Sequence, residues 1–189
     1  MEKIEIHPFG AFLPQNMSYL LVGTFPGKQY SQLPQEEVLA DPLAWSYAGK
    51  NQFWKIIENI YEVSLPDRKS KQLLFSELGI GLMDLIYSCS RKNNTNLDNN
   101  LTNITWNKAA FETLLAEKSD LKILCTGKGV ADILKKWFPE YEAKIIALPS
   151  PSPIYASMKL EEKIAFYKNV FPLNYFNPQP KPFSSGKKT

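Results

Sequence analysis

The sequence predicts an α/β protein with a parallel sheet that is covered by helices on both faces. Two observations support this prediction. Short apolar runs of the length of buried strands alternate along the chain with longer segments in which apolar residues recur at helical spacing. This alternation is typical of strand–helix–strand units, whose strands lie parallel and are buried on both sides. With 189 residues, 44% of them hydrophobic, the chain can bury one core.

The elements follow one another in a regular order. The predicted strands span residues 19–22, 81–88, 121–125 and 144–148. The predicted helices span residues 51–61, 66–78, 106–117, 130–138 and 160–170. Phe53, Ile57 and Ile60 have the spacing of one helical face. Pro66 and Gly79 are a typical opening and stop for the helix between them.

The remaining segments define the expected domain. One domain is predicted over residues 1–173, and the first 15 residues are not assigned a place in it. Residues 90–103 are crowded with asparagine and are expected to form a polar loop with Asx turns. The tail, residues 174–189, is expected to be loosely ordered, or else to serve as an anion-binding arm. No apolar run approaches the roughly 20 residues of a membrane span and no signal peptide opens the chain, so a cytoplasmic location is expected.

The charge of the chain permits an anionic partner. Lysine and arginine total 22 and aspartate and glutamate total 19, which gives a net charge of +3. A mildly basic surface can bind nucleic acid without being required to do so. Arg68 and Arg91 are the only arginines. Lysine binds phosphate as a point charge and forks poorly onto base edges, so any nucleic-acid contact would rest on the backbone.

Several kinds of site are disfavoured. Cys89 and Cys125 lie at or near the ends of apolar runs and are expected to be buried free thiols. The chain has no CxxC spacing and His7 is its single histidine, so no metal site is predicted. A Ser–His or Cys–His catalytic pair would have to use His7. The glycine motifs of dinucleotide and nucleotide binding are missing, and the nucleophile elbow is missing too, so an α/β-hydrolase is not expected.

A specialised loop follows the predicted strand 19–22. It consists of Gly23, Thr24, Phe25, Pro26 and Gly27. The glycines let the chain turn sharply and pass close to a ligand, and the proline stiffens the turn. Exposed backbone N–H groups in this loop can bind a carbonyl or phosphate oxygen, and the phenylalanine can present its face to a planar ring. The alternative is a tight turn with Phe25 in the core.

A second specialised loop follows the predicted strand 144–148 and alternates proline with serine over residues 149–153. Each proline fixes its own φ and keeps the preceding residue extended, so we expect a rigid segment, the Pro-Ser rail. The hydroxyls of Ser150 and Ser152 can meet phosphate oxygens. Ile154 or Tyr155, just beyond, can act as an apolar wedge in a base stack. The alternative is a stiff connector.

A third segment leads into the predicted helix 51–61. Tyr47 can stack on a base, and Lys50 carries a positive charge beside it. Asn51 stands at the helix start, where capping is its alternative role. An asparagine is no strong base near neutral pH, but its amide oxygen can orient a water molecule.

These three segments, in this order, resemble the uracil-DNA glycosylase superfamily. Its members share a G-x-x-P-G or G-x-D-P-Y loop after the first strand, which matches residues 23–27. A later H-P-S-P or L-P-S-x-S-P loop matches residues 148–153. The segment 47–54 is similar to the F/Y-A-x-P-x-N-x-F-W pattern of the mismatch-specific and hypoxanthine-type branches. Leucine rather than histidine at Leu148 favours the hypoxanthine-type branch.

The resemblance implies a three-layer α/β/α sandwich with a central, mostly parallel four-stranded sheet. It also implies a monomeric, monofunctional DNA glycosylase that needs no metal or cofactor. Such an enzyme hydrolyses the N-glycosidic bond of a damaged or deaminated base in DNA, such as uracil or hypoxanthine. The target nucleotide is first flipped out of the stack.

The resemblance also implies roles for individual residues. Asn51 would position the attacking water. The base pocket would be lined by Gly23, Thr24, Phe25, Pro26, Gly27, Tyr47 and Thr126. The DNA contacts would come from Lys50, Arg91, Lys92, Ser150, Ser152, Ile154 and Tyr155.

The sequence departs from the family pattern at several of these positions. Phe25 stands where many branches place a catalytic aspartate or asparagine, and Thr126 where several branches read the base with asparagine. Leu148 replaces a histidine that stabilises the leaving base. The spacing from Tyr47 to Asn51 is one residue short and lacks its proline. Activity would then come largely from base flipping, strain and electrostatic stabilisation of an oxocarbenium-like transition state.

Other interpretations stay open. Asp84, at a strand end, is a candidate carboxylate helper, with a cap or turn role as the alternative. The chain as a whole could be a binding module of the same fold that retains affinity for DNA or a base without turnover. A small-molecule nucleotide hydrolase is the third candidate.

Overall fold

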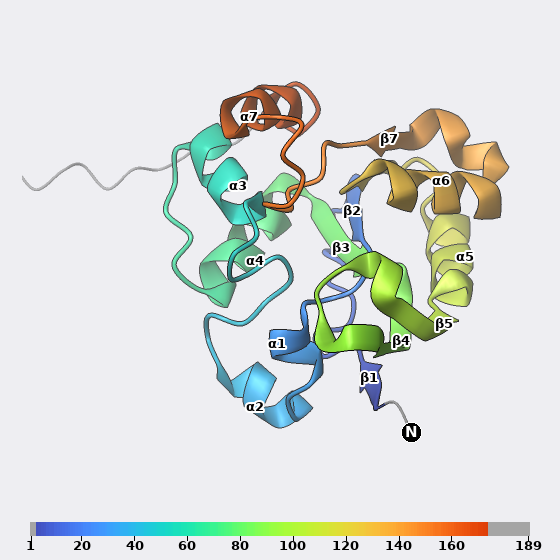
Figure 1. Cartoon of the computed structure of the whole chain (residues 1–189). Helices are drawn as coiled ribbons and strands as arrows, with labels where there is room; N and C mark the ends of the chain where they lie inside the picture. The colour runs from blue at the N-terminus through green and yellow to red at the C-terminus, as the bar shows by residue number, and fades with distance from the viewer. Residues whose placement is uncertain (1–2, 174–189) are drawn as a thin grey trace, which may run out of the picture.

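A parallel sheet of four strands forms the centre of the fold, as predicted (Figure 1). The computed structural model describes residues 3–173. The strands are β2 (Tyr19–Gly23), β3 (Ile80–Asp84), β6 (Lys122–Cys125) and β7 (Ile145–Ala147). Their spatial order is β3-β2-β6-β7, so the first of them in sequence is paired on both sides.

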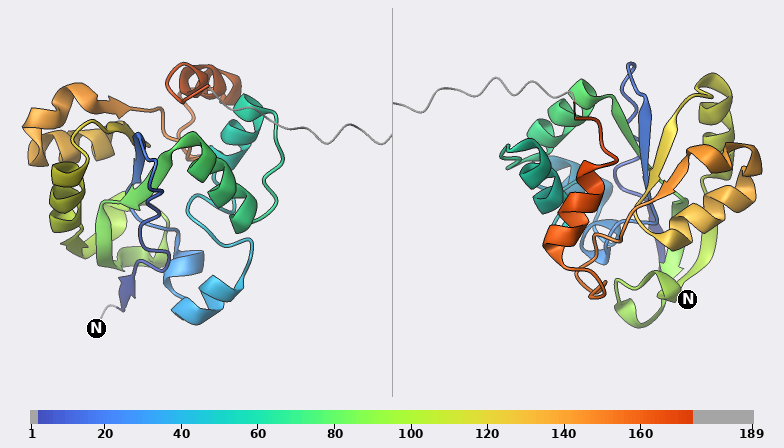
Figure 2. Two further views of the ribbon diagram at one scale, coloured as in Figure 1. Left: turned by 180° about the vertical axis from the view of Figure 1, so that it is seen from behind. Right: turned by 90° about the horizontal axis from the view of Figure 1, so that it is seen from above.

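Each face of the sheet is covered by helices, which confirms the three-layer prediction (Figure 2). The helices α3 (Phe53–Tyr61), α4 (Arg68–Leu78) and α7 (Leu160–Lys168) share a core with Leu21 of β2. The helices α5 (Lys108–Glu117) and α6 (Lys128–Trp137) share the other core with Leu20 and Val22. Successive side chains of a strand point to opposite faces, so β2 contributes to both cores.

A second, antiparallel sheet differs from the prediction. The expected strand 81–88 breaks at Leu85, and the chain continues as β4 (Ile86–Arg91) in a sheet of order β1-β4-β5. The expected polar loop 90–103 is also wrong at both ends, because β4 reaches Arg91 and β5 (Leu101–Trp106) begins before residue 103. Between these strands lie two short turns, η1 (Lys92–Asn94) and η2 (Asp98–Asn100). Their asparagines Asn93 and Asn94 adopt the left-handed backbone that asparagine tolerates.

Residues 4–12, which belong to the segment that the sequence left unplaced, pair with one strand of each sheet. Strand β1 (Ile4–Ile6) pairs with β4. Farther along, Phe12 and Leu82 exchange two backbone hydrogen bonds of 2.8 and 2.7 Å, which occupies the outer edge of β3. A sheet edge that is paired in this way offers no template for other chains.

The remaining elements are short, and the helix starts shift by a few residues. They are α1 (Lys28–Ser31), α2 (Gln35–Ala40) and η3 (Pro139–Lys144). Helix α3 begins at Phe53 rather than at residue 51, and α4 begins after Asp67, whose side chain accepts a hydrogen bond from the Ser70 N–H. Helix α5 begins at Lys108 because Trp106 still belongs to β5. Within residues 3–173, no helix has the length and apolar character needed to cross a membrane.

The expected free thiols are both buried in one core. Burial raises the pKa of Cys89 to about 11 and that of Cys125 to about 12, so neither is a ready nucleophile. The expected loose tail, residues 174–189, lies outside the described residues.

Gly79, at the end of α4, gives a test of the fold. Its φ is +64°, and a methyl group there would lie 2.8 Å from the carbonyl oxygen of Asn16. We expect Gly79→Ala to lower the free energy of unfolding by about 1 kcal/mol or more, measured by urea denaturation. Gly129→Ala in α6 is the control, because an added Cβ at Gly129 meets no atom within 4 Å. Equal losses in the two variants would contradict this account.

Candidate functional site

The candidate site lies at the carboxyl edge of the parallel sheet. Strand β2 has β3 on one side and β6 on the other, so the connections leaving β2 and β3 diverge at this edge. Ligands of open α/β sheets bind at such a point. The register pairs Gly23 directly with Asp84, and Thr126 follows the neighbouring strand β6. The segments that follow β2, β6 and β7 are therefore brought to one edge.

The loop 23–27 is held by its carbonyl groups. Gly23 O accepts a hydrogen bond from Leu85 N at 2.9 Å, and Thr24 O accepts one from Ile86 N at 3.1 Å. Among the residues that the structure describes, the N–H groups of Phe25 and Gly27 make no hydrogen bond. A loop whose carbonyls are occupied while two amide N–H groups are free can bind an electronegative atom of a ligand.

Arg91 differs from its expected role as a DNA contact. Its guanidinium is 3% exposed and donates to Glu5 (3.2 Å), to the carbonyl of Pro26 (3.1 Å) and to the carbonyl of Thr95 (2.9 Å). Burial alone would raise the pKa of Glu5, but hydrogen bonds and the Arg91 charge outweigh it and lower that pKa. Arg91 thus holds the loop 23–27 against residues 92–100 and has no free face for phosphate.

Phe25 is half-buried between charged and aromatic neighbours. Its ring meets that of His7 edge-on, with centroids 5.8 Å apart, and the Arg91 guanidinium lies 5.9 Å from its centroid. It is therefore partly packed against the core, as the alternative interpretation required, and it remains partly open to solvent.

Tyr47 is held in a strained backbone conformation. Its φ is +61°, which is uncommon for a residue with a side chain and costs about 1–3 kcal/mol. Its ring packs on Phe53 at 4.6 Å and its hydroxyl lies 3.3 Å from the Thr126 hydroxyl. Burial raises the pKa of Tyr47 well above its ordinary value, and the negative charge of Asp84 adds to the effect. Tyr47 therefore presents a neutral phenol to the site.

Asn51 lies one position before the N-cap residue Gln52 and caps α3 through an Asx turn, which is close to the capping role that was its alternative. Its side-chain oxygen accepts a hydrogen bond of 2.8 Å from Phe53 N, which satisfies one of the open donors at the start of α3. Asn51 is partly exposed, and Lys50 beside it is exposed. The amide oxygen has a second lone pair that is free for a ligand or water.

A buried lysine fastens the Pro-Ser rail. Lys163 of α7 is 1% exposed, and its ammonium donates to the carbonyls of Ser152 (3.3 Å) and Tyr155 (3.2 Å). Its third partner is the side-chain oxygen of Gln52, at 2.9 Å. Gln52 N in turn donates to Pro151 O at 3.0 Å, so the rail runs beside the start of α3 (Figure 1). Burial lowers the pKa of Lys163.

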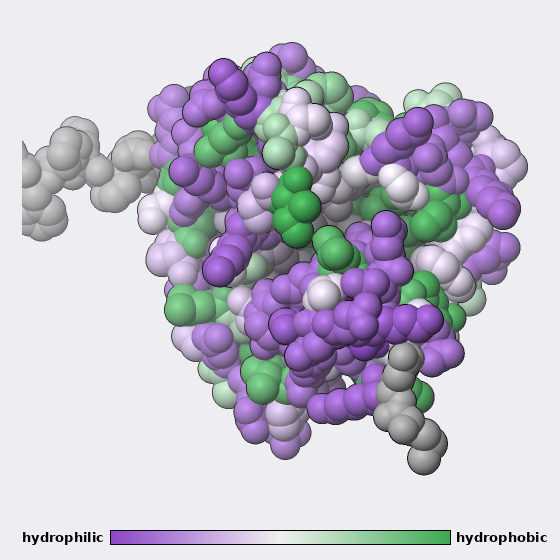
Figure 3. Space-filling model, viewed as in Figure 1, coloured by the Kyte–Doolittle hydropathy of each residue, from purple (hydrophilic) through white to green (hydrophobic). Residues whose placement is uncertain are grey.

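The serine side chains of the rail are partly exposed, and two apolar side chains follow just beyond it. The hydroxyls of Ser150 and Ser152 each accept a backbone N–H two residues on, at 3.3 Å. Ile154 is 68% exposed and Tyr155 is 42% exposed. Isolated apolar side chains stand among hydrophilic ones on the face shown in Figure 3. Lys92 is also exposed, whereas Leu148 is buried in the core.

One pair at this edge was not assigned by the sequence analysis. His7 Nε2 lies 2.9 Å from Asp84 Oδ2, and both side chains are almost fully buried. The only signals were the single histidine of the chain and a carboxylate at a strand end. Nothing in the sequence pattern joins residues that lie 77 positions apart. Within residues 3–173, no three histidine, cysteine, aspartate or glutamate side chains gather as a metal site would require.

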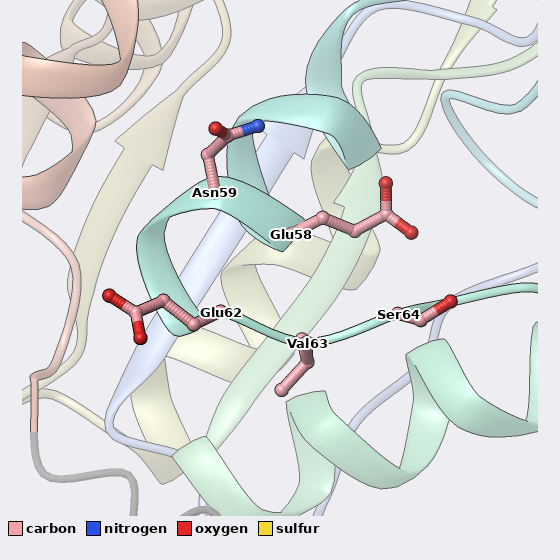
Figure 4. A pocket seen from close by; sticks show the side chains of 5 residues that line it. All are labelled: Glu58, Asn59, Glu62, Val63 and Ser64. Atoms are coloured by element: carbon pink, nitrogen blue, oxygen red, sulfur yellow. The ribbon is translucent and has the colours of Figure 1, made fainter. Parts of the chain in front are cut away.

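A surface hollow at the far end of α3 does not belong to this site. It is an open depression of about 630 Å³, lined by Glu58, Asn59, Glu62, Val63 and Ser64. Figure 4 shows the carboxylates of Glu58 and Glu62 pointing apart, and the Glu58 carboxylate accepts the Leu65 N–H at 2.8 Å. These groups serve the chain turn after the helix, so size alone does not mark the functional site.

Comparison with known proteins agrees with the fold. Residues 9–171 match the uracil DNA glycosylase superfamily. The chain is similar to the solution NMR structure of a provisionally named uracil DNA glycosylase from Methanosarcina acetivorans. The TM-score is 0.58 at 19% sequence identity, over 90% of this chain and 98% of the other. No curated protein matches the chain.

Gly23 tests the crowding at the sheet edge. An added Cβ would overlap the Tyr47 hydroxyl and would lie 2.6 Å from Asp84 Oδ1. We expect Gly23→Ala to lower the free energy of unfolding by roughly 1–3 kcal/mol. Tyr47→Phe removes the overlapped oxygen, so the loss in the double variant should be smaller than the sum of the single losses. Strict additivity in urea denaturation would argue against this arrangement.

Proposed function

We propose that this chain, which belongs to the uracil DNA glycosylase superfamily, is a monofunctional DNA glycosylase. Its reaction would be hydrolysis of the N-glycosidic bond of a damaged or deaminated base in DNA, such as uracil or hypoxanthine. One observation carries the proposal. The loop 23–27, Tyr47, Thr126 and the Pro-Ser rail meet at the carboxyl edge of one sheet. A base-flipping enzyme needs both a base pocket and a support for the strand, side by side.

The loop 23–27 and its neighbours would form the base pocket. The free N–H groups of Phe25 and Gly27 are suited to carbonyl oxygens of a flipped base. The Thr126 hydroxyl donates its proton to Val22 O at 3.2 Å, so the oxygens of Thr126 and of the Tyr47 phenol beside it are available as acceptors. Aromatic faces of Phe25 or Tyr47 would stack on the base. Hydrogen bonds of both kinds suit an oxidised or deaminated base, which carries carbonyl groups beside ring N–H groups.

The Pro-Ser rail would hold the DNA strand from which the base came. Each serine hydroxyl accepts a backbone N–H and keeps its own proton to donate to a phosphate oxygen. Lys50 and Lys92 would add positive charge at the rim. The exposed Ile154 or Tyr155 would fill the gap left in the base stack.

Asn51 would position the attacking water through the free lone pair of its amide oxygen. Its contact with Phe53 N fixes the amide plane, so the second lone pair has a defined direction. The sugar gains positive charge as the bond to the base breaks. The carbonyl dipole of an asparagine can stabilise such a charge when it is held in place.

A binding module without turnover is the second candidate, and two observations favour it. Phe25 and Leu148 place apolar side chains where many relatives would have polar groups, and Leu148 is buried. Measurement of activity separates the two candidates, because both predict affinity for DNA.

The test of the function is a panel of duplexes carrying uracil, hypoxanthine or xanthine, followed by alkaline cleavage. We expect strand cleavage with at least one base. We expect Asn51→Ala to reduce the rate by about 100-fold, because the water loses its position. Asn51→Ser should lose as much activity while keeping the helix cap, and Asn59→Ala, exposed on the same helix, is the control. Undiminished turnover in Asn51→Ala would exclude this role for Asn51.

The rail is tested through its buried anchor. Lys163→Met removes the donors that hold the carbonyls of Ser152 and Tyr155. We expect the Kd for a lesion duplex to rise about tenfold, measured by fluorescence anisotropy at fixed salt, because the rail is no longer preorganised. Lys168→Met removes an equal charge from the exposed surface of α7. If both variants weaken binding equally, the effect is one of charge alone.

A further inference from the structure

We propose that Asp84 supplies the catalytic carboxylate of this site and that His7 is the residue that positions it. The inference rests on the proposed glycosylase function and adds a residue to it. It starts from the register of the sheet, which sets Asp84 directly beside Gly23, the first residue of the loop 23–27. Phe25 lies two residues farther along that loop. The Asp84 carboxylate therefore lies at the end of the strand next to β2, whose following loop carries the apolar Phe25.

The hydrogen bonds around His7 fix its tautomer. The backbone N–H groups of Phe9 and Gly10 both point at Nδ1, at 3.3 and 3.2 Å. An atom that accepts two N–H groups cannot carry a proton, so the proton of the ring is on Nε2. Nε2 then donates to Asp84 Oδ2 at 2.9 Å. The ring is therefore the donor of this hydrogen bond and Asp84 Oδ2 is its acceptor.

The other oxygen of Asp84 is left for the site. Oδ1 lies near the Cα of Gly23, where an added Cβ would be 2.6 Å away. Among residues 3–173, no donor binds Oδ1. Within that range, the only fully buried side-chain polar atom without a hydrogen-bond partner is Ser46 Oγ. Asp84 Oδ1 thus has no hydrogen-bond donor among these residues, and it is open to a ligand.

The carboxylate is also held rigidly from behind. The amide of Asn107 donates to the backbone carbonyl of Asp84 at 2.8 Å. His7 is in turn wedged between the rings of Phe9 and Phe25, with centroids at 6.2 and 5.8 Å. A charge that is already oriented in a water-poor site stabilises a developing opposite charge without reorganisation.

The chemical step balances with water as the only co-reactant. The bond from the sugar C1′ to the base nitrogen breaks, and its electron pair leaves with the base. The negative charge of Asp84 stabilises the cationic sugar. The water oxygen then forms its bond to C1′ and passes one proton to Asp84 Oδ1. The base takes up a proton from solvent, and Asp84 releases its proton to solvent.

The test uses the full chain and the lesion duplex that the wild type cleaves best, in single turnover with enzyme in excess. We expect Asp84→Asn, which keeps an acceptor for His7, to lower the rate about 100-fold or more. Its melting temperature and its affinity for the duplex should stay close to those of the wild type. Asp132→Asn, at an exposed position of α6, is the matched control and should leave the rate unchanged.

Further variants separate chemistry from structure. Asp84→Ala should recover activity when formate is added, because the small carboxylate can occupy the vacated space. His7→Ala should lose about tenfold in rate, and His7→Gln, which retains an N–H donor, should recover part of that loss. A purely structural pair would lower the melting temperature and would not respond to formate.

The outcomes also distinguish the two proposals. A wild type that cleaves no base of the panel overturns the glycosylase function and this inference with it. An active wild type whose rate is unchanged in Asp84→Asn overturns the role of Asp84 alone. If Asp84→Asn fails to fold, Asp84→Ala with added formate is the deciding test. If formate then restores no activity, the inference is overturned.

Discussion

The parallel pairing of β2 with both of its neighbours is the constraint on which the rest of the structure depends. It buries Leu20, Leu21 and Val22 on both faces of the sheet at once. It also ends β2 beside β3 and β6, so Gly23 must lie next to Asp84 and near Thr126. A side chain at Gly23 would fill the space these groups share. The composition of the site therefore follows from the arrangement of the core.

The site is supported by buried charges that face inward. The Arg91 guanidinium ties the loop 23–27 to residues 92–100, and the Lys163 ammonium ties the Pro-Ser rail to α3 and α7. Both cations donate their hydrogen bonds to backbone carbonyls and side chains of the protein. Burying such groups is costly unless every donor is satisfied, and here each has several partners. The loops are consequently stiff for reasons beyond their prolines.

The sequence predicted those features that local patterns determine. The central sheet, its helices and the two loops depend on periodicity and on proline and glycine, and they were found close to the expected positions. The antiparallel sheet was missed because β3 and β4 are separated only by Leu85, and one apolar run covers both. Arg91 looked like a free cation because its partner Glu5 lies 86 residues away. The pair of His7 and Asp84 could not be predicted for the same reason, because its members lie 77 residues apart.

The segment that contains β1 and His7 has a consequence for the order of assembly. It is made well before its partners Asp84, Cys89 and Arg91. Closing a chain loop of this length costs entropy that is recovered only when both ends are ordered. The two cores can therefore form before this segment docks. Until this segment docks, the parallel sheet can be complete while Asp84 at its edge still lacks its partner.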